Sequence, residues 1–211
     1  MKNRFILFAV LFVFATMTYN AKAFHLVPYG KIGYYAMTSE INVLGAKIEN
    51  SYSGLAWGLG LQVELGLSKS ITINPGLEYF TSSYEVGIEK IISVAKYEVT
   101  DSYFSVPVIV NYCFSGVNAE GLSIGAGPKF NYYLEDEDAN ILNTLKKTAA
   151  QIQEDDKMDN LSVSIVGNIS YQLALGLKAS AVFEYSLTNL SSIESVVLKP
   201  YFLGAQIAWR F

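Results

Sequence analysis

The sequence predicts an all-β fold, an eight-stranded antiparallel up-and-down transmembrane β-barrel preceded by a cleavable signal peptide. Three observations predict it. The chain opens with a basic and then apolar leader, a period of two dominates the remainder, and the connections between the alternating segments run long, short, long, short, long, short, long. Charged residues are only 16% of the chain, so an exported protein of this kind needs an apolar environment around it.

Residues 1–23 have the features of a signal peptide. Lys2 and Arg4 are followed by the apolar run Phe5–Phe14 and by a small-residue cleavage site, Ala21-Lys22-Ala23. The run is too short for a spanning helix, which needs about 20 apolar residues. We therefore expect a signal peptide over residues 1–23 and one barrel domain over residues 24–211.

The segment Gly54–Leu67 is the clearest predicted strand. Alternate residues place leucines, Trp57 and Val63 on one face, and mostly glycine with Gln62 and Glu64 on the other. A narrow lumen suits the second face, because small residues leave room for a few large polar ones. Seven more strands are expected, over Leu26–Met37, Ile71–Ser82, Asp101–Tyr112, Gly121–Tyr133, Leu161–Tyr171, Gly176–Leu187 and Val197–Phe211.

The connections between these strands indicate sidedness. Four are long (Thr38–Ser53, Ser83–Thr100, Leu134–Asn160 and Thr188–Val196) and three are short (Ser68–Ser70, Cys113–Glu120 and Gln172–Leu175). Outer-membrane barrels have long extracellular loops and short periplasmic turns, so we expect that orientation here. The loop Leu134–Asn160 also has apolar residues at helical spacing among many acids, which predicts a short surface helix. Its acids could bind a divalent cation or a partner, or simply be solvated.

Two residue types qualify the strand prediction. Aromatic residues gather near the strand ends, which predicts girdles at the two membrane interfaces; they are Tyr34, Tyr35, Trp57, Tyr79, Phe80, Tyr103, Phe104, Tyr112, Phe130, Tyr132, Tyr133, Tyr171, Phe183, Tyr185, Tyr201 and Trp209. Proline removes a ladder donor, so bulges or broken ladders are expected at Pro75, Pro107 and Pro128.

The face opposite the large apolar residues carries most of the charge in the strands. It includes Lys31, Gln62, Glu64, Glu78, Lys129, Lys178, Glu184, Gln206 and Arg210. Counting along the strands puts Glu78, Lys129 and Glu184 at nearly one depth. An unpaired charge there would be costly, so we expect Lys129 to bridge the two glutamates and plug the lumen, with Arg210 and Glu64 nearer the periplasmic rim. The alternative is separate hydration of each group in a wet lumen.

Several motifs resemble the PorT-like outer-membrane β-barrel family, small outer-membrane proteins of Bacteroidetes-type bacteria. They are the proline-centred strand Phe104–Tyr112, the run Gly125-Ala126-Gly127-Pro128, the segment Glu184–Leu190, and the alternating C-terminus. The resemblance implies the fold and an outer-membrane location, and carries no catalytic residue. It also implies that Tyr201, Leu203, Ile207, Trp209 and Phe211 form the assembly signal that the barrel-assembly machinery reads.

Three function classes fit the sequence poorly. The only histidine, His25, follows the predicted cleavage site, and no nucleophile motif is present, which argues against an enzyme. Eight strands are too few for a wide porin, and the C-terminal Phe211 and glycine-rich face argue against a soluble lipocalin-like cup. Removal of the signal peptide takes away Lys2, Arg4 and Lys22 but no acid, so the net charge falls from −4 to −7, which argues against nucleic acid.

We therefore expect a structural or surface-interaction protein with a plugged or very narrow lumen, which acts through four extracellular loops. The alternatives are an accessory subunit of an outer-membrane secretion or assembly complex, or a small-solute channel. The expected partners are outer-membrane lipid and, during biogenesis, the assembly machinery. No catalytic, metal-binding or cofactor-binding residue is predicted.

Overall fold

The computed structural model describes residues 24–43, 46–90, 93–134, 161–190 and 196–211. The predicted signal peptide over residues 1–23 lies outside the described residues. So does nearly all of the loop Leu134–Asn160, with its expected helix and its acids. Within the described part of the chain, no helix is long and apolar enough to cross a membrane.

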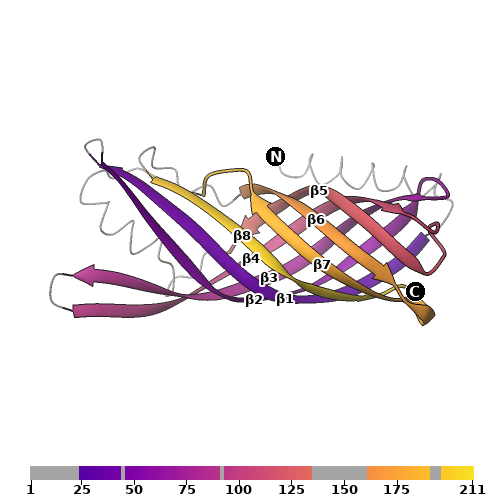
Figure 1. Ribbon diagram of the computed structural model, residues 1–211, viewed down its shortest axis with the longest axis horizontal. Helices are drawn as coiled ribbons and strands as arrows, with labels where there is room; N and C mark the ends of the chain where they lie inside the picture. Colours follow the sequence, from indigo (N-terminus) through magenta and orange to yellow (C-terminus); the bar gives the residue numbers. More distant parts are fainter. Residues whose placement is uncertain (1–23, 44–45, 91–92, 135–160, 191–195) are drawn as a thin grey trace, which may run out of the picture.

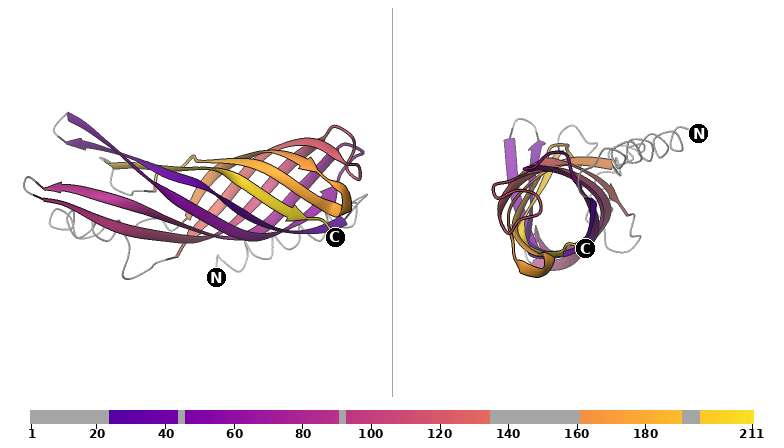
Figure 2. Two further views of the ribbon diagram at one scale, coloured as in Figure 1. Left: turned by 60° about the horizontal axis from the view of Figure 1, so that its bottom comes forward. Right: turned by 90° about the vertical axis from the view of Figure 1, so that its right-hand side faces the viewer.

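Eight antiparallel strands form one closed barrel (Figure 1). Each strand pairs with its neighbour in sequence, and β1 closes the ring by pairing with β8. Figure 2 shows this ring end-on. The strands are β1 Phe24–Val43, β2 Ala46–Gly66, β3 Ile71–Lys90, β4 Ser93–Cys113, β5 Gly121–Tyr133, β6 Leu161–Gln172, β7 Leu177–Ser186 and β8 Val196–Trp209.

The first two expected long loops are wrong, because they are strand. Residues 38–43 and 46–53 continue β1 and β2, which stay paired up to Val43 and Ala46. In the same way β3 and β4 stay paired up to Lys90 and Ser93. The ladder between β2 and β3 begins only at Gly54 and Tyr84, so the two hairpins separate and project beyond the barrel (Figure 1).

The alternation of side chains places an apolar band on the outside of the barrel. Leu55, Leu59 and Ile207 are about 60% exposed (61%, 59% and 61%), whereas Gln62 and Glu64 on the other face are buried. Exposed apolar side chains on every strand, with polar ones inside, are the pattern of a barrel surrounded by lipid.

The prolines interrupt the ladders without adding residues. The β3–β4 pairing, for example, stops at Pro75 and Val108 and resumes at Glu78 and Ser105, the same number of residues along each strand. The β2–β3 and β4–β5 ladders break in the same way beside Pro75 and Pro128. The expectation of broken ladders is therefore confirmed, and none of these interruptions is a bulge.

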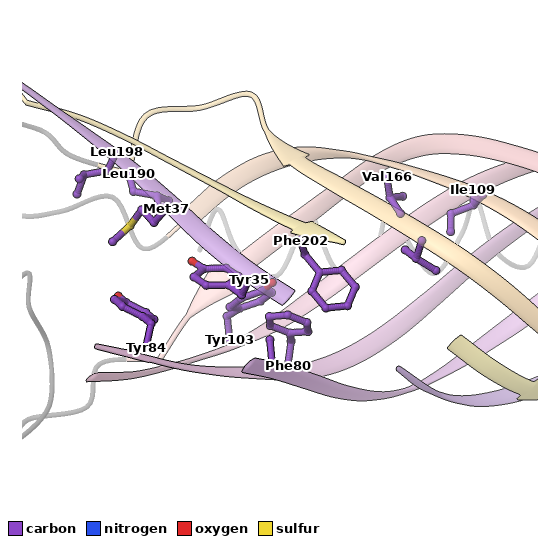
Figure 3. Close-up of a cluster of buried hydrophobic side chains, with 12 residues drawn as sticks. Tyr35, Met37, Phe80, Tyr84, Tyr103, Ile109, Val166, Leu190, Leu198 and Phe202 are labelled. Carbon is purple, nitrogen blue, oxygen red and sulfur yellow. The ribbon is translucent and has the colours of Figure 1, made fainter. Parts of the chain in front are cut away.

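Four aromatic residues assigned to a girdle point into the barrel instead. Tyr35, Phe80 and Tyr103 lie inside, and Phe202 joins them from β8 (Figure 3). Tyr133 is partly buried and packs against them. Their rings pack at centroid distances typical of aromatic pairs, such as 4.8 Å for Phe80–Tyr103 and 5.3 Å for Phe80–Phe202. This aromatic layer fills the lumen toward the end where the hairpins project.

The barrel is also obstructed at its other end, where the short turns lie. The β4–β5 turn folds inward so that Val117 is buried, and its amide donates to Lys69 O at 2.9 Å. The β6–β7 turn is a short 3₁₀ segment, Ala174–Gly176, in which Leu175 has a left-handed backbone with φ of 60°. We call the end of the barrel that carries these turns the short-turn end, and the opposite end, from which the hairpins project, the hairpin end.

Candidate functional site

Lys129 lies at the centre of a charged cluster in the lumen. Its Nζ donates to Glu78 Oε1 at 2.6 Å and to Glu184 Oε2 at 2.7 Å, and all three side chains are buried. The residues come from β5, β3 and β7, three strands that alternate round the ring. The structure therefore brings together the three residues that the sequence placed at one depth, in direct contact rather than separately hydrated.

Lys31 is a second cation in the same cluster. Its Nζ lies 2.9 Å from Glu78 Oε1 and also contacts Glu184 Oε1. The sequence placed Lys31 in the lumen but not at this contact. The cluster of Lys31, Glu78, Lys129 and Glu184, which we call the lumen cluster, thus holds two positive and two negative charges, and each lysine contacts both glutamates.

Tyr29 completes the coordination of Glu78 and was missed from the sequence. Its hydroxyl donates to Glu78 Oε2 at 2.7 Å, and Ser105 donates to Oε1 at 3.3 Å. A glycine on β2 makes this position possible, because a Cβ on Gly60 would lie 2.3 Å from the Tyr29 ring. The sequence contained the information needed to predict this contact. Tyr29 is two residues from Lys31 and so shares its side of β1, and the neighbouring strand β2 is rich in glycine.

The aromatic layer covers the lumen cluster on the hairpin side. Lys31 Nζ lies 4.5 Å from the Phe80 ring centroid and 4.9 Å from that of Phe202. Lys129 Nζ lies 5.2 Å from Phe80 and 5.3 Å from Tyr103. Ammonium groups at these distances are attracted to the faces of the rings. The rings thus both exclude water from the cluster and favour its cations.

A second polar group closes the short-turn end, where the sequence placed Glu64 and Arg210. Arg210 Nη1 lies 3.3 Å from Glu64 Oε1 and also donates to Val117 O. Lys178 approaches Glu64 less closely, at 4.0 Å. His25 is at this rim as expected, with Nδ1 3.1 Å from Phe211 O.

Little space remains around the lumen cluster. The cavity beside it, lined by residues such as Gln62, Pro107 and Asn168, has a volume of about 10 Å³, roughly the room that one water molecule needs. The cluster therefore leaves room for about one water molecule beside it. Among the described residues, no group of three or more His, Cys, Asp or Glu side chains could hold a metal ion.

The five residues of the expected assembly signal share one face of the C-terminal strand. Leu203, Ile207, Trp209 and Phe211 are exposed toward the surroundings, and Tyr201 is partly so. The amide of Phe211 donates to Leu26 O at 2.9 Å, which ties the C-terminus to β1. Reading of this face by an assembly machinery stays a prediction.

A family model described as "outer membrane protein beta-barrel domain" matches residues 11–192. No curated protein matches the chain. Solved structures similar to it include those of three bacterial proteins. Ail, the attachment invasion locus protein of Yersinia pestis, is 15% identical, with 87% of this chain and 99% of that one covered and a TM-score of 0.38. Neisserial surface protein A is 11% identical, covering 87% and 97%, with a TM-score of 0.46. OprG of Pseudomonas aeruginosa is 15% identical, covering 90% and 98%, with a TM-score of 0.47.

Proposed function

The chain belongs to the outer membrane protein β-barrel domain family, and from that premise we propose that it is a plugged, non-enzymatic barrel that presents its hairpin end for surface interactions. The observation that carries the proposal is the lumen cluster covered by the aromatic layer. The two lysines and two glutamates form four ion pairs, three of them with N–O distances of 2.6 to 2.9 Å. Neither water nor a solute is therefore needed to compensate the buried charges.

The orientation follows from the connections. The short turns face the periplasm and the hairpin end faces outward, because outer-membrane barrels keep their short turns inside. The hairpins β1–β2 and β3–β4 then extend outside the cell, where they and the remaining outer connections are available to bind a ligand or a protein. Binding residues are commonly carried by such projecting segments on a rigid scaffold.

The finer assignment within the family rests on the motif resemblance alone. By that resemblance, a PorT-like accessory role in a secretion or assembly complex is the second candidate for this surface. No catalytic role is assigned to His25, since its ring nitrogens lie near Phe211 O and near Asn118 Oδ1, at 3.1 and 3.2 Å.

Planar-bilayer recordings test whether the lumen is plugged. The native protein should show at most brief, small conductances. A variant with all four cluster residues changed to Ala keeps the net charge of the lumen unchanged and widens the lumen between the aromatic layer and the short-turn end, so it should open more often and for longer than the native protein. A steady conductance through the native barrel would instead favour the small-solute channel. A silent four-alanine variant would mean that the aromatic layer and the contacts at the short-turn end close the lumen without the cluster.

A further inference from the structure

The β6–β7 turn combines two features that an aqueous turn avoids. Leu175 is 86% exposed, and its backbone is left-handed at φ 60° and ψ 21°, followed by Gly176 at φ 83°. Two successive positive φ angles are typical of a type I′ turn, whose first position favours Asn, Asp or Gly. Leucine is unfavourable in this conformation, so the turn geometry alone does not account for a leucine at this exposed tip.

The other two turns at the same end differ in composition. The β2–β3 turn exposes Lys69 between two serines, and the β4–β5 turn exposes Ser115, Asn118 and Glu120 beside Phe114 and Ala119, so both turns carry exposed polar residues. In contrast, every exposed residue of the described range 161–187 is apolar or Tyr. These residues are Leu161, Ile165, Ile169, Tyr171, Leu173, Ala174, Leu175, Ala179, Ala181, Phe183, Tyr185 and Leu187.

The length of β7 places this turn at the membrane boundary. The strand has 10 residues, and a tilted strand needs about 9–11 to cross the hydrocarbon layer, so none is left to carry the turn far into water. The turn also adjoins the C-terminal aromatic residues: Leu177 pairs with Trp209, and the Arg210 amide donates to Gly176 O at 2.9 Å. The apolar turn is therefore continuous with the lipid-facing surface.

We propose that the β6–β7 turn is a membrane anchor that inserts Leu173 and Leu175 into the interfacial layer of the leaflet at the short-turn end. Lipid is the occupant because the patch continues the lipid-facing band without a polar break. The β2–β3 turn lies on the opposite side of the ring, and its Lys69 stays in water. One side of the rim is thus seated deeper than the other, which tilts the barrel and sets the direction in which the hairpins project. This inference rests on the membrane location and not on the plugged lumen.

Site-specific fluorescence tests the anchor. Cys113 is the only native cysteine, so a Cys113→Ser background accepts a single nitrobenzoxadiazole label at Leu175→Cys or, as the matched control, at Lys69→Cys. The protein is reconstituted alone in phosphatidylethanolamine–phosphatidylglycerol vesicles. One vesicle set carries a nitroxide on the lipid headgroup, and iodide serves as the aqueous quencher.

The label at position 175 should emit further to the blue, lose most of its intensity to the lipid nitroxide and resist iodide, while the label at position 69 should do the reverse. A second reporter, Ala174→Cys, keeps the test open if the first variant does not insert. Adding Leu175→Asn to the Ala174→Cys variant removes the apolar side chain, while asparagine suits the turn geometry. Quenching of the label at position 174 by the lipid nitroxide should therefore fall several-fold in a folded barrel. Equal iodide access at positions 175 and 69 in these vesicles, which contain no other protein, would overturn the proposal. The turn would then be exposed to water when no partner is present, as expected if a periplasmic protein were its true occupant.

Discussion

Replacing Lys129 with Met removes one of the two cations that hold Glu78 and Glu184 together. Methionine fills a similar volume, so the change isolates the charge. Removing one partner of a buried ion pair costs about 3–5 kcal/mol, because an uncompensated charge stays buried. Lys31 still contacts both carboxylates, so we expect the lower end of that range, about 3 kcal/mol of unfolding free energy.

Urea unfolding of the reconstituted barrel measures this loss, with fluorescence from the lipid-facing Trp57 and Trp209 as the signal. The double variant Lys129→Met with Glu184→Gln makes the cluster neutral again. Its loss of unfolding free energy should therefore be smaller than the sum of the losses of the two single variants, by about 1–3 kcal/mol. Lys178→Met is the matched control, since its Nζ lies 4.0 Å from Glu64 and Arg210 still pairs with that carboxylate at 3.3 Å, so the loss should be clearly smaller than that of Lys129→Met. Strictly additive losses, or a Lys129→Met loss no greater than the control, would refute the reasoning.

Three further predictions address sidedness, assembly and packing. Protease added to intact cells should cut within Leu134–Asn160 and spare Ser68–Ser70, as read by the fragment sizes; cleavage at the short turn instead would invert the topology. Deleting Phe211 should block insertion, measured by heat-modifiable migration of the protein from membrane fractions. The cause should be lost recognition by the assembly machinery rather than lost stability, because even a charge near the interface costs only about 0–1 kcal/mol. Normal insertion of the deletion variant would contradict this. Gly60→Val should displace Tyr29 from Glu78, since a Cβ there would lie 2.3 Å from the ring, and cost about 1–3 kcal/mol in the same urea assay; an unchanged midpoint would show that the ring moves freely.

The strand prediction succeeded where one face is apolar and failed where neither is. Lipid on one side and a polar lumen on the other force a period of two, and Gly54–Leu67 shows it clearly. In residues 38–53 and 83–100 charges interrupt the apolar faces: Tyr84, Val86 and Ile88 alternate with Glu85, Gly87 and Glu89, but Lys90 and Lys96 fall on the apolar face, so these segments look like loops in the sequence. There the hairpin ladders make the strands, and composition alone does not record which residues pair.

The aromatic residues show what periodicity leaves open. Tyr79 and Phe80 are neighbours on β3 and must point to opposite faces, yet both lie near the same depth and both suit a membrane girdle. The structure buries Phe80 against Phe202 and leaves Tyr79 on the outer face against Trp57 and Phe104. Membership of a face was predictable, whereas the use of the inner aromatic residues as a layer over the lysines was not.

Depth along the barrel was predictable for three cluster residues and not for the fourth. Counting residues from the strand ends ignores the stagger between tilted strands and the reach of a lysine side chain. By that count Lys31 lies nearer the short-turn end, but its ammonium group still arrives 2.9 Å from Glu78. Charge neutrality was the better guide, because two buried glutamates facing a single lysine leave one negative charge unmatched.

The balance of charge in the lumen cluster also decides how the barrel responds to an electric field. Two lysines and two glutamates sum to zero, so a voltage across the membrane does no net work when the four move together. A single uncompensated charge that crossed the whole field would gain or lose about 2.3 kcal/mol per 100 mV, enough to bias its position. The closure that we propose for the native barrel should therefore be independent of voltage and the same at either polarity, whereas the cluster of the Lys129→Met variant carries one net charge on which the field can act.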